Sequence, residues 1–249
     1  MRRAATALVV TMALSAVTVQ SQGRQGGGGP PSPRVGAPID LTGTWVAVVT
    51  EDWRWRMRTP PKGDYASLPL TEAAVKLANA WDPARDAAAG EQCRGYGAPA
   101  IMRLPGRVRI AWENDATLKV DTEAGTQTRR FHFVRTEQPG APSWQGRSIA
   151  SWQFAGGRRG GSSGGGSLRV VTENLRAGYL RKNGVPYSVD VQLTEFYNVV
   201  TDATSGDTWL FVTTMVEDPQ YLSVPRYVTS SHFKKTDSAT WNPTPCEAQ

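Results

Sequence analysis

The sequence predicts a single, mainly β domain, an antiparallel meander of about eight or nine strands that closes into a barrel. Three observations lead to this prediction. Strand-like runs recur at short spacing between turn residues, only one segment has a clear helical pattern, and about 210 residues remain once a non-globular N-terminus is set aside. Barrels and sandwiches of that size commonly form one domain.

The first 22 residues have the three-part layout of a secretory signal peptide. A positive start at residues 1–3 is followed by an uncharged, mainly apolar run at 4–19 and by polar residues at 20–22. The apolar run is shorter than the roughly 20 residues that span a bilayer, although a short membrane anchor stays an alternative. We therefore expect a periplasmic or secreted protein with no stable membrane insertion after the signal is cleaved.

A linker at residues 23–38 follows the signal peptide. It consists mostly of Gly, Pro, Arg and Ser and offers a core almost nothing to bury, so we expect it to be a disordered tether. The folded domain then covers residues 39–249.

Nine runs after the linker have the composition of β-strands. Two of them flank the turn-forming pair Asn114-Asp115, which predicts a hairpin. The predicted strands are Leu41–Thr50, Arg107–Glu113, Thr117–Thr122, Thr126–Val134, Arg147–Phe154, Leu168–Asn174, Tyr187–Tyr197, Thr208–Val216 and Arg226–Lys234.

The helical pattern lies in a long insertion after the first strand, roughly residues 59–105. Ala73–Trp81 consists of good helix formers, Thr71 can cap its N-terminus, and Asp82-Pro83 would end it. A second short helix could follow at Ala84–Ala89. We expect this partly helical insertion to cover one end of the barrel.

The charge distribution argues against a nucleic-acid partner. The chain has 28 Lys and Arg against 22 Asp and Glu, and most of its basic residues are scattered among carboxylates. An interface with nucleic acid needs basic residues clustered on one face. The sequence leaves the oligomeric state open.

Two cysteines in an exported chain are most simply read as one disulfide, here Cys93–Cys246. This bridge would tie the C-terminal tail to the body of the domain. A catalytic or metal-binding thiol pair is the alternative, but it lacks a CxxC spacing and a nearby His.

One carboxylate falls on an apolar strand face. The odd positions of Tyr187–Tyr197 are mainly apolar and include Glu195, while Arg129 shares a face with Phe131 and Phe133. A carboxylate on a buried face must be paired or protonated. The pattern therefore suggests an Arg129–Glu195 pair inside the barrel; the alternative places both residues at strand ends in water.

Tryptophan and arginine alternate from Trp53 to Arg58. If this run is extended, Trp53, Trp55 and Met57 share one face and three arginines the other. The aromatic face could line a pocket and the arginines could grip anionic groups. The alternative is an edge strand with one core face and one solvated face.

We find no pattern that names a reaction. Glu217 and Asp218 are adjacent, so on a strand they point to opposite sides and cannot form one catalytic dyad. Asp218 could instead orient a backbone turn. His132 and His232 are isolated, and no metal-ligand spacing or nucleophile motif accompanies them. We expect no metal and no cofactor.

Two resemblances bear on the fold. Leu41–Trp45, Leu-Thr-Gly-Thr-Trp, resembles the Gly-x-Trp motif in the first strand of lipocalin-type barrels, where the Trp plugs the closed end. Almost the whole mature chain is similar to a group of uncharacterised exported proteins of soil bacteria, including acidobacteria. That resemblance implies secretion, a β-rich fold and no established activity. The matching stretches are Asp40–Trp45, Glu51–Arg56, Trp81–Pro83, Cys93–Gly97, Pro142–Gly146, Asn183–Ser188, Glu217–Leu222 and Trp241–Cys246.

These observations favour a lipocalin-like binding protein for a small lipophilic molecule. An acid–base enzyme acting on a lipophilic substrate without a metal, through Glu195, Arg129 or Asp218, stays open, as does a structural or envelope-interaction protein without a ligand. Whether the protein is an enzyme is thus undecided. The candidate ligand-binding residues are Trp45, Trp53, Trp55, Arg129, Phe131, Tyr187, Glu195, Tyr197 and Phe211.

Overall fold

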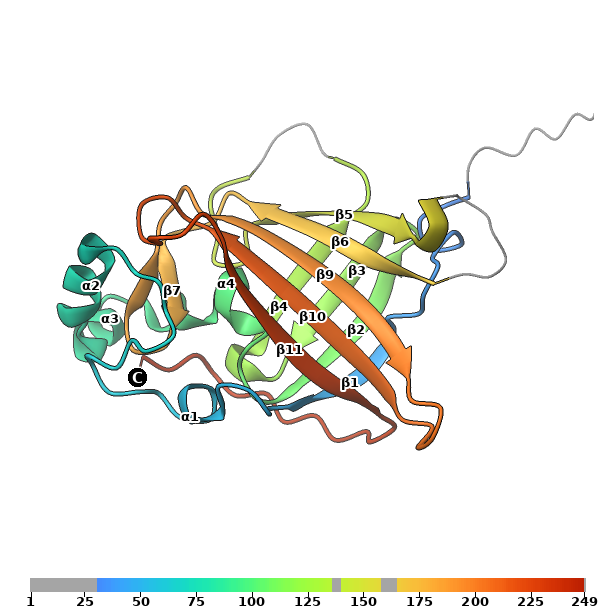
Figure 1. The fold of residues 1–249 in the computed structure, drawn as a ribbon, viewed down its shortest axis with the longest axis horizontal. Coiled ribbons are helices and arrows are strands. Elements are labelled where there is room, and N and C mark those ends of the chain that lie inside the picture. Colours follow the sequence, from blue (N-terminus) through green and yellow to red (C-terminus); the bar gives the residue numbers. More distant parts are fainter. Residues whose placement is uncertain (1–30, 136–139, 158–164, 249) are drawn as a thin grey trace, which may run out of the picture. The chain divides into compact units, whose positions relative to one another are not determined.

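The structure is a computed structural model that describes residues 31–135, 140–157 and 165–248 (Figure 1). Nine strands form a closed barrel in the order β1-β11-β10-β9-β6-β5-β4-β3-β2. The barrel strands are β1 (Gly43–Val48), β2 (Arg107–Asn114), β3 (Thr117–Thr122), β4 (Gln127–His132), β5 (Arg147–Phe154), β6 (Gly166–Glu173), β9 (Gln192–Thr201), β10 (Thr208–Glu217) and β11 (Tyr227–Thr236). The predicted nine-stranded barrel is confirmed.

The barrel departs from the predicted antiparallel meander at one seam. Strands β4 and β5 pair in parallel, with Phe131 opposite Ser148 and His132 opposite Ile149, whereas every other neighbouring pair in the barrel is antiparallel. Parallel neighbours cannot be joined by a tight turn. Gln145, two residues before β5, donates a hydrogen bond to Gln127, the first residue of β4, at 3.1 Å.

The predicted strand Tyr187–Tyr197 is wrong in its first half. A separate two-stranded sheet is formed by β7 (Gly178–Arg181) and β8 (Val185–Tyr187), and β9 begins only at Gln192. The chain turns between them because Asp218 holds Ser188: its carboxylate accepts hydrogen bonds from the Ser188 backbone N–H at 2.6 Å and hydroxyl at 2.9 Å. Sequence alternation could not reveal a contact to a residue 30 positions away.

The insertion after β1 is helical, as predicted, and lies with β7 and β8 at one end of the barrel (Figure 1). Thr71 caps α2 by accepting a hydrogen bond from Ala74 N at 3.3 Å, and Asp82 caps α3 in the same way from Ala84 N at 3.0 Å. The helices are α1 (Trp53–Arg56), α2 (Glu72–Asn79), α3 (Pro83–Ala88) and α4 (Ala98–Ile101), with a 3-10 turn at Gln92–Tyr96.

The interior of the barrel is filled by side chains. Trp45, in the Gly-x-Trp segment, has no exposed surface, and its indole N–H donates to Leu41 O at 3.0 Å. A ring cluster of Trp112, Phe133 and Trp152 packs against this core, with neighbouring ring centroids 5.3–6.5 Å apart. The core residues are Leu41, Trp45, Tyr96, Ile101, Met102, Val108, Ile110, Leu118, Val120, Phe131, Ala150, Leu168, Val170, Tyr197, Leu210, Val212 and Phe233.

The C-terminal part of the predicted linker contacts the barrel. Pro33 O accepts a hydrogen bond from the Trp152 indole at 2.8 Å, and Arg34 N donates to Asp115 O at 3.1 Å. These two hydrogen bonds hold this part of the chain against the barrel. The first one also supplies an acceptor for the indole N–H of Trp152. Residues 1–22 and 23–30 lie outside the described residues.

The disulfide between Cys93 and Cys246 is present and closes a separation of 153 residues. It joins the 3-10 turn of the insertion to the C-terminal tail. The tail is also held by Glu123, whose carboxylate accepts from Asn242 N at 2.6 Å and whose carbonyl accepts from Thr244 N at 2.8 Å. None of the helices among the described residues is long and apolar enough to cross a membrane.

Candidate ligand-binding site

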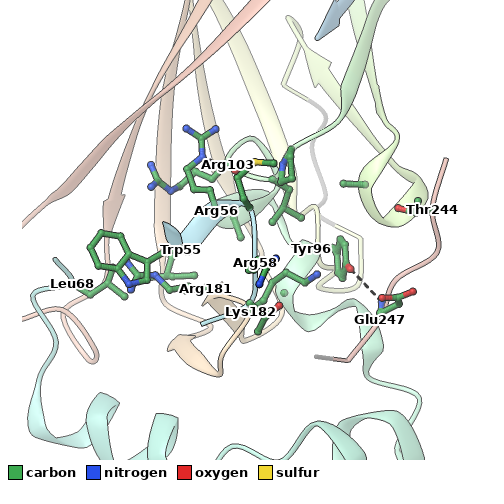
Figure 2. A pocket seen from close by; sticks show the side chains of 18 of the residues that line it. Trp55, Arg56, Arg58, Leu68, Tyr96, Arg103, Arg181, Lys182, Thr244 and Glu247 are labelled. Carbon is green, nitrogen blue, oxygen red and sulfur yellow. Dashed lines mark hydrogen bonds between the residues drawn. The ribbon is translucent and has the colours of Figure 1, made fainter. Parts of the chain in front are cut away.

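A cavity of about 260 Å³ lies at the end of the barrel where the insertion, the β7–β8 sheet and the C-terminal tail meet (Figure 2). Its walls combine arginines with apolar and aromatic side chains. The lining residues are Trp55, Arg56, Met57, Arg58, Thr59, Leu68, Gly95, Tyr96, Ala100, Arg103, Leu104, Pro105, Ala124, Leu180, Arg181, Lys182, Tyr227, Thr244, Pro245 and Glu247.

The Trp–Arg run that supplies one wall is a helical turn and not an extended strand. Asp52 adopts the left-handed conformation with φ 52°, and its carbonyl accepts hydrogen bonds from the N–H groups of Trp55 and Arg56. Successive side chains of a turn are about 100° apart, so the predicted two-faced arrangement does not form. Trp53 is 64% exposed, while Arg56 is only 6% exposed.

Arg56 is the least exposed cation of the cavity lining. Its Nε donates to Arg103 O at 2.8 Å and its Nη1 pairs with Glu51. The remaining nitrogen, Nη2, is buried and finds no hydrogen-bond partner among the described residues. Burial lowers the pKa of Arg56, and the positive charge of Arg103 lowers it further.

Arg181 enters the cavity from β7. Its guanidinium donates to Ala66 O at 3.2 Å and lies 5.2 Å from the centre of the Trp55 ring. Burial lowers the pKa of Arg181, because backbone carbonyls and a ring face compensate a buried charge less completely than a carboxylate does. Arg103 is better compensated, since its Nη2 lies 2.6 Å from a carboxylate oxygen of Asp52.

The apolar part of the wall is built around Tyr96 and Trp55. Lys182 places its ammonium 5.0 Å from the centre of the Tyr96 ring, and the Tyr96 hydroxyl accepts a hydrogen bond from Glu247 N at 3.3 Å, as Figure 2 shows. Leu68 adds apolar surface to the lining. Ring faces next to cationic groups can receive the apolar body of a ligand and its anionic end together.

The buried pair suggested by the strand pattern is present inside the barrel. Arg129 and Glu195 contact each other through both guanidinium Nη atoms, at 2.6 and 3.0 Å, and neither side chain has exposed surface. Tyr197 donates to Glu195 at 3.2 Å, and Thr172 accepts from Arg129 at 3.3 Å. Burial opposes the charge of Arg129, but the Glu195 carboxylate outweighs it and raises the pKa of Arg129.

The candidate ligand-binding residues lie in five different places. Trp55 is the only one of the nine that lines the cavity. Phe211 packs edge-on against His232 with ring centroids 5.0 Å apart, and Trp53 is exposed. Trp45, Arg129, Phe131, Glu195 and Tyr197 are buried within the barrel, and Tyr187 is buried in a second core beneath the β7–β8 sheet.

Sequence analysis missed most of the cationic wall. Arg103, Arg181 and Lys182 come from segments that follow Arg56 by 47 residues or more, and nothing local connects them. Arg56 did belong to a segment flagged for anion binding. An extended strand would have put the arginines on the face opposite Trp55. The helical turn instead buries Arg56.

The other polar residues considered for chemistry have structural partners. Asp218 is 1% exposed, and its carboxylate accepts hydrogen bonds from Ser188 and from the backbone of Gln220 and Tyr221. Asp218 therefore organises a backbone turn, which is one of the two roles suggested for it by the sequence; the other was acid–base chemistry. Within residues 31–135, 140–157 and 165–248, no group of three His, Cys, Asp or Glu side chains could hold a metal ion.

Comparisons with models of known protein families, with curated proteins and with solved structures find no match to this chain.

Proposed function

We propose that this protein binds a small lipophilic molecule in the cavity at the end of its barrel, and that it does so in the periplasm or outside the cell. A closed β-barrel is compatible with a lipocalin-like binding protein. Here the interior is occupied by Trp45, Phe131 and Tyr197, so the ligand would sit at the end of the barrel. The supporting observation is a cavity walled by Trp55, Tyr96 and Leu68.

The size of the cavity limits the ligand. Its volume of about 260 Å³ is just under the roughly 300–1,000 Å³ typical of small-molecule sites. We therefore expect a compact ligand, or the buried end of a longer one. The Cys93–Cys246 disulfide supports the location, since such bonds persist in oxidising compartments.

The structure favours binding over acid–base chemistry. Glu195 is held by Arg129 and Tyr197, and Asp218 by Ser188 and two backbone N–H groups. Neither carboxylate lines the cavity. A general acid or base has to reach a substrate atom within hydrogen-bond distance, and these two groups are engaged with the protein itself.

The test uses N-phenyl-1-naphthylamine, a neutral lipophilic dye that fluoresces when it leaves water. We expect saturable binding that weakens about tenfold in Trp55→Ala, because about 1.4 kcal/mol of apolar contact is lost. Trp53→Ala is the matched control, since Trp53 is exposed and does not line the cavity. Absence of saturable binding, or equal weakening in both variants, would overturn the proposal.

A further inference from the structure

We propose that the ligand carries an anionic head group, a carboxylate or a phosphate, and that Arg56 and Arg181 hold it while the apolar part lies against Trp55 and Tyr96. This inference rests on the proposed function and names the class of ligand that the cavity selects.

The cavity lining carries more positive than negative side chains. Arg56, Arg58, Arg103, Arg181 and Lys182 line the cavity, and Glu247 is its single lining carboxylate. Two acidic residues next to the cavity reduce this excess, because Glu51 pairs with Arg56 and Asp52 pairs with Arg103. Arg58 and Arg181 form no ion pair within the described part of the chain. A positive excess thus remains after the pairs are subtracted.

Arg56 also has one N–H donor that makes no hydrogen bond within the described residues. The Arg56 side chain is 3% exposed, and its Nη2 is buried without a partner among the described residues. A buried donor without an acceptor is costly, and a ligand oxygen that reaches Nη2 as the cavity wall adjusts would relieve that cost. Oxygen atoms of carboxylates and phosphates are the acceptors that a guanidinium binds most strongly.

The positive charges of Arg56 and Arg181 are not fully balanced by the groups around them. Burial lowers the pKa of both Arg56 and Arg181, so each positive charge is less stable in the cavity than in water. A bound anion would restore that lost stability, while a neutral head group would supply an acceptor without opposite charge. The site therefore discriminates by charge as well as by hydrogen bonding.

The two aromatic rings of the lining limit the rest of the ligand. Trp55 has the Arg181 guanidinium against its ring, and Tyr96 has the Lys182 ammonium against its ring. Each ring thus joins apolar surface to a cation. A ligand with a short hydrocarbon chain and one terminal anion matches this arrangement, whereas a ligand charged at both ends would bury one charge against apolar surface.

The experiment compares four ligands of one chain length by displacement of N-phenyl-1-naphthylamine: decanoate, decyl phosphate, decanol and decyltrimethylammonium. We expect at least one anion to bind about tenfold or more tightly than decanol, as one charge-assisted hydrogen bond would give. The cation should bind more weakly than decanol. The two anions then distinguish a carboxylate site from a phosphate site, and either preference supports the proposal.

Variants locate the anion. Arg56→Lys keeps the charge but removes the fork of donors, and Arg181→Met removes a charge while keeping an apolar stem. Each should weaken the preferred anion about tenfold, and by a clearly larger factor than it weakens decanol. Arg130→Met is the control, because Arg130 is exposed, pairs with Glu113 and does not line the cavity.

Two results would distinguish failure of the anionic head group from failure of lipophilic binding itself. If decanol binds as tightly as both anions, or if Arg56→Lys and Arg181→Met weaken all ligands equally, the anionic head group is wrong while lipophilic binding stands. If neither the dye nor any decyl compound binds saturably, the proposed function fails as well.

Discussion

The side chains of Arg129 and Glu195, 66 residues apart in the sequence, meet inside the barrel with an Nη2–Oε2 distance of 2.6 Å and no exposed surface on either side chain. The pair bridges β4 and β9, which lie on either side of β5 and β6 in the barrel order. Tyr197 and Thr172 add further hydrogen bonds to the pair, while Arg129 Nε is buried without a partner among the described residues. The pair therefore lies in a polar layer within an otherwise apolar core.

Breaking this pair should destabilise the fold strongly. Glu195→Gln and Arg129→Met each leave one buried charge without its partner, which costs about 3–5 kcal/mol of the free energy of unfolding. The double variant Arg129→Met/Glu195→Gln should cost less than the sum, because no charge is left behind. Urea unfolding of the four proteins measures this difference.

Arg130→Met supplies the control for the pair. Arg130 is the next residue on β4, and its ion pair with Glu113 is solvent-exposed, so its loss should cost less than about 1 kcal/mol. If Arg129→Met is no more costly than Arg130→Met, the interior pair does not hold the fold together. A loss of ligand affinity larger than the loss of stability would instead assign the pair a functional role.

Removing the disulfide should affect both stability and binding. In the chain-entropy model, closing a loop of 153 residues is worth on the order of 5 kcal/mol, and measured losses are typically about 2–5 kcal/mol. We expect Cys93→Ser/Cys246→Ser to unfold at lower urea concentration. The tail residues Thr244, Pro245 and Glu247 line the cavity, so dye affinity should fall as the tail loosens.

Reduction of the wild-type protein by dithiothreitol is the matched control for the cysteine variant, because it opens the same bond without a substitution. Both should lose affinity to the same extent. Unchanged affinity in a protein that remains folded would mean that the tail is no part of the binding site.

The backbone turn at Gly125 should tolerate no side chain. Gly125 and Gly206 have similar positive φ values, 70° and 75°, so an alanine at either position carries a similar backbone cost of about 1–2 kcal/mol. A Cβ at Gly125 would overlap the ring of Tyr96, whereas a Cβ at Gly206 meets nothing within 4 Å. Gly125→Ala should therefore cost about 1–3 kcal/mol more than Gly206→Ala.

Thermal or urea unfolding of the two alanine variants checks this difference directly. Because Tyr96 lines the cavity, Gly125→Ala should also weaken dye binding in the protein that remains folded. Equal stability of the two variants would show that Tyr96 can move aside without loss.

Tyr179 should make stability fall at alkaline pH. The pKa of the Tyr179 phenol is raised to about 12. Burial is the main cause, and the hydrogen bond that Tyr179 donates to Asp86 at 2.7 Å is the second. The unfolded chain ionises near pH 10. The contribution of Tyr179 is thus complete below about pH 10 and is lost as pH rises from about 10 to about 12.

Urea unfolding across that pH range should show a shallower decline for Tyr179→Phe than for the wild type, since a phenylalanine has no proton to lose. The ultraviolet absorbance of tyrosinate, compared between the two proteins, locates the same ionisation. Identical pH profiles would place the Tyr179 pKa at its ordinary value.

The sequence by itself determined the features that depend on neighbours along the chain. Strands β3 and β5 have the predicted bounds because alternation and hairpin turns are local signals. The caps at Thr71 and Asp82 follow from residues within three positions of each other. The burial of Glu195 could be read from the apolar residues that share its strand face. A single pair of cysteines left one possible disulfide.

Only the tertiary structure decided what is assembled from distant segments. The parallel seam between β4 and β5 depends on how the barrel closes, and the turn that splits β8 from β9 depends on Asp218. The cavity joins Arg56 to Arg103 and Arg181 through three elements that share no sequence pattern. Alternation at Trp53–Arg58 suggested a strand, but a helical turn buries Arg56 instead. The reason is physical: periodicity reports which side of its own element a residue occupies, and a binding site depends on which elements then face one another.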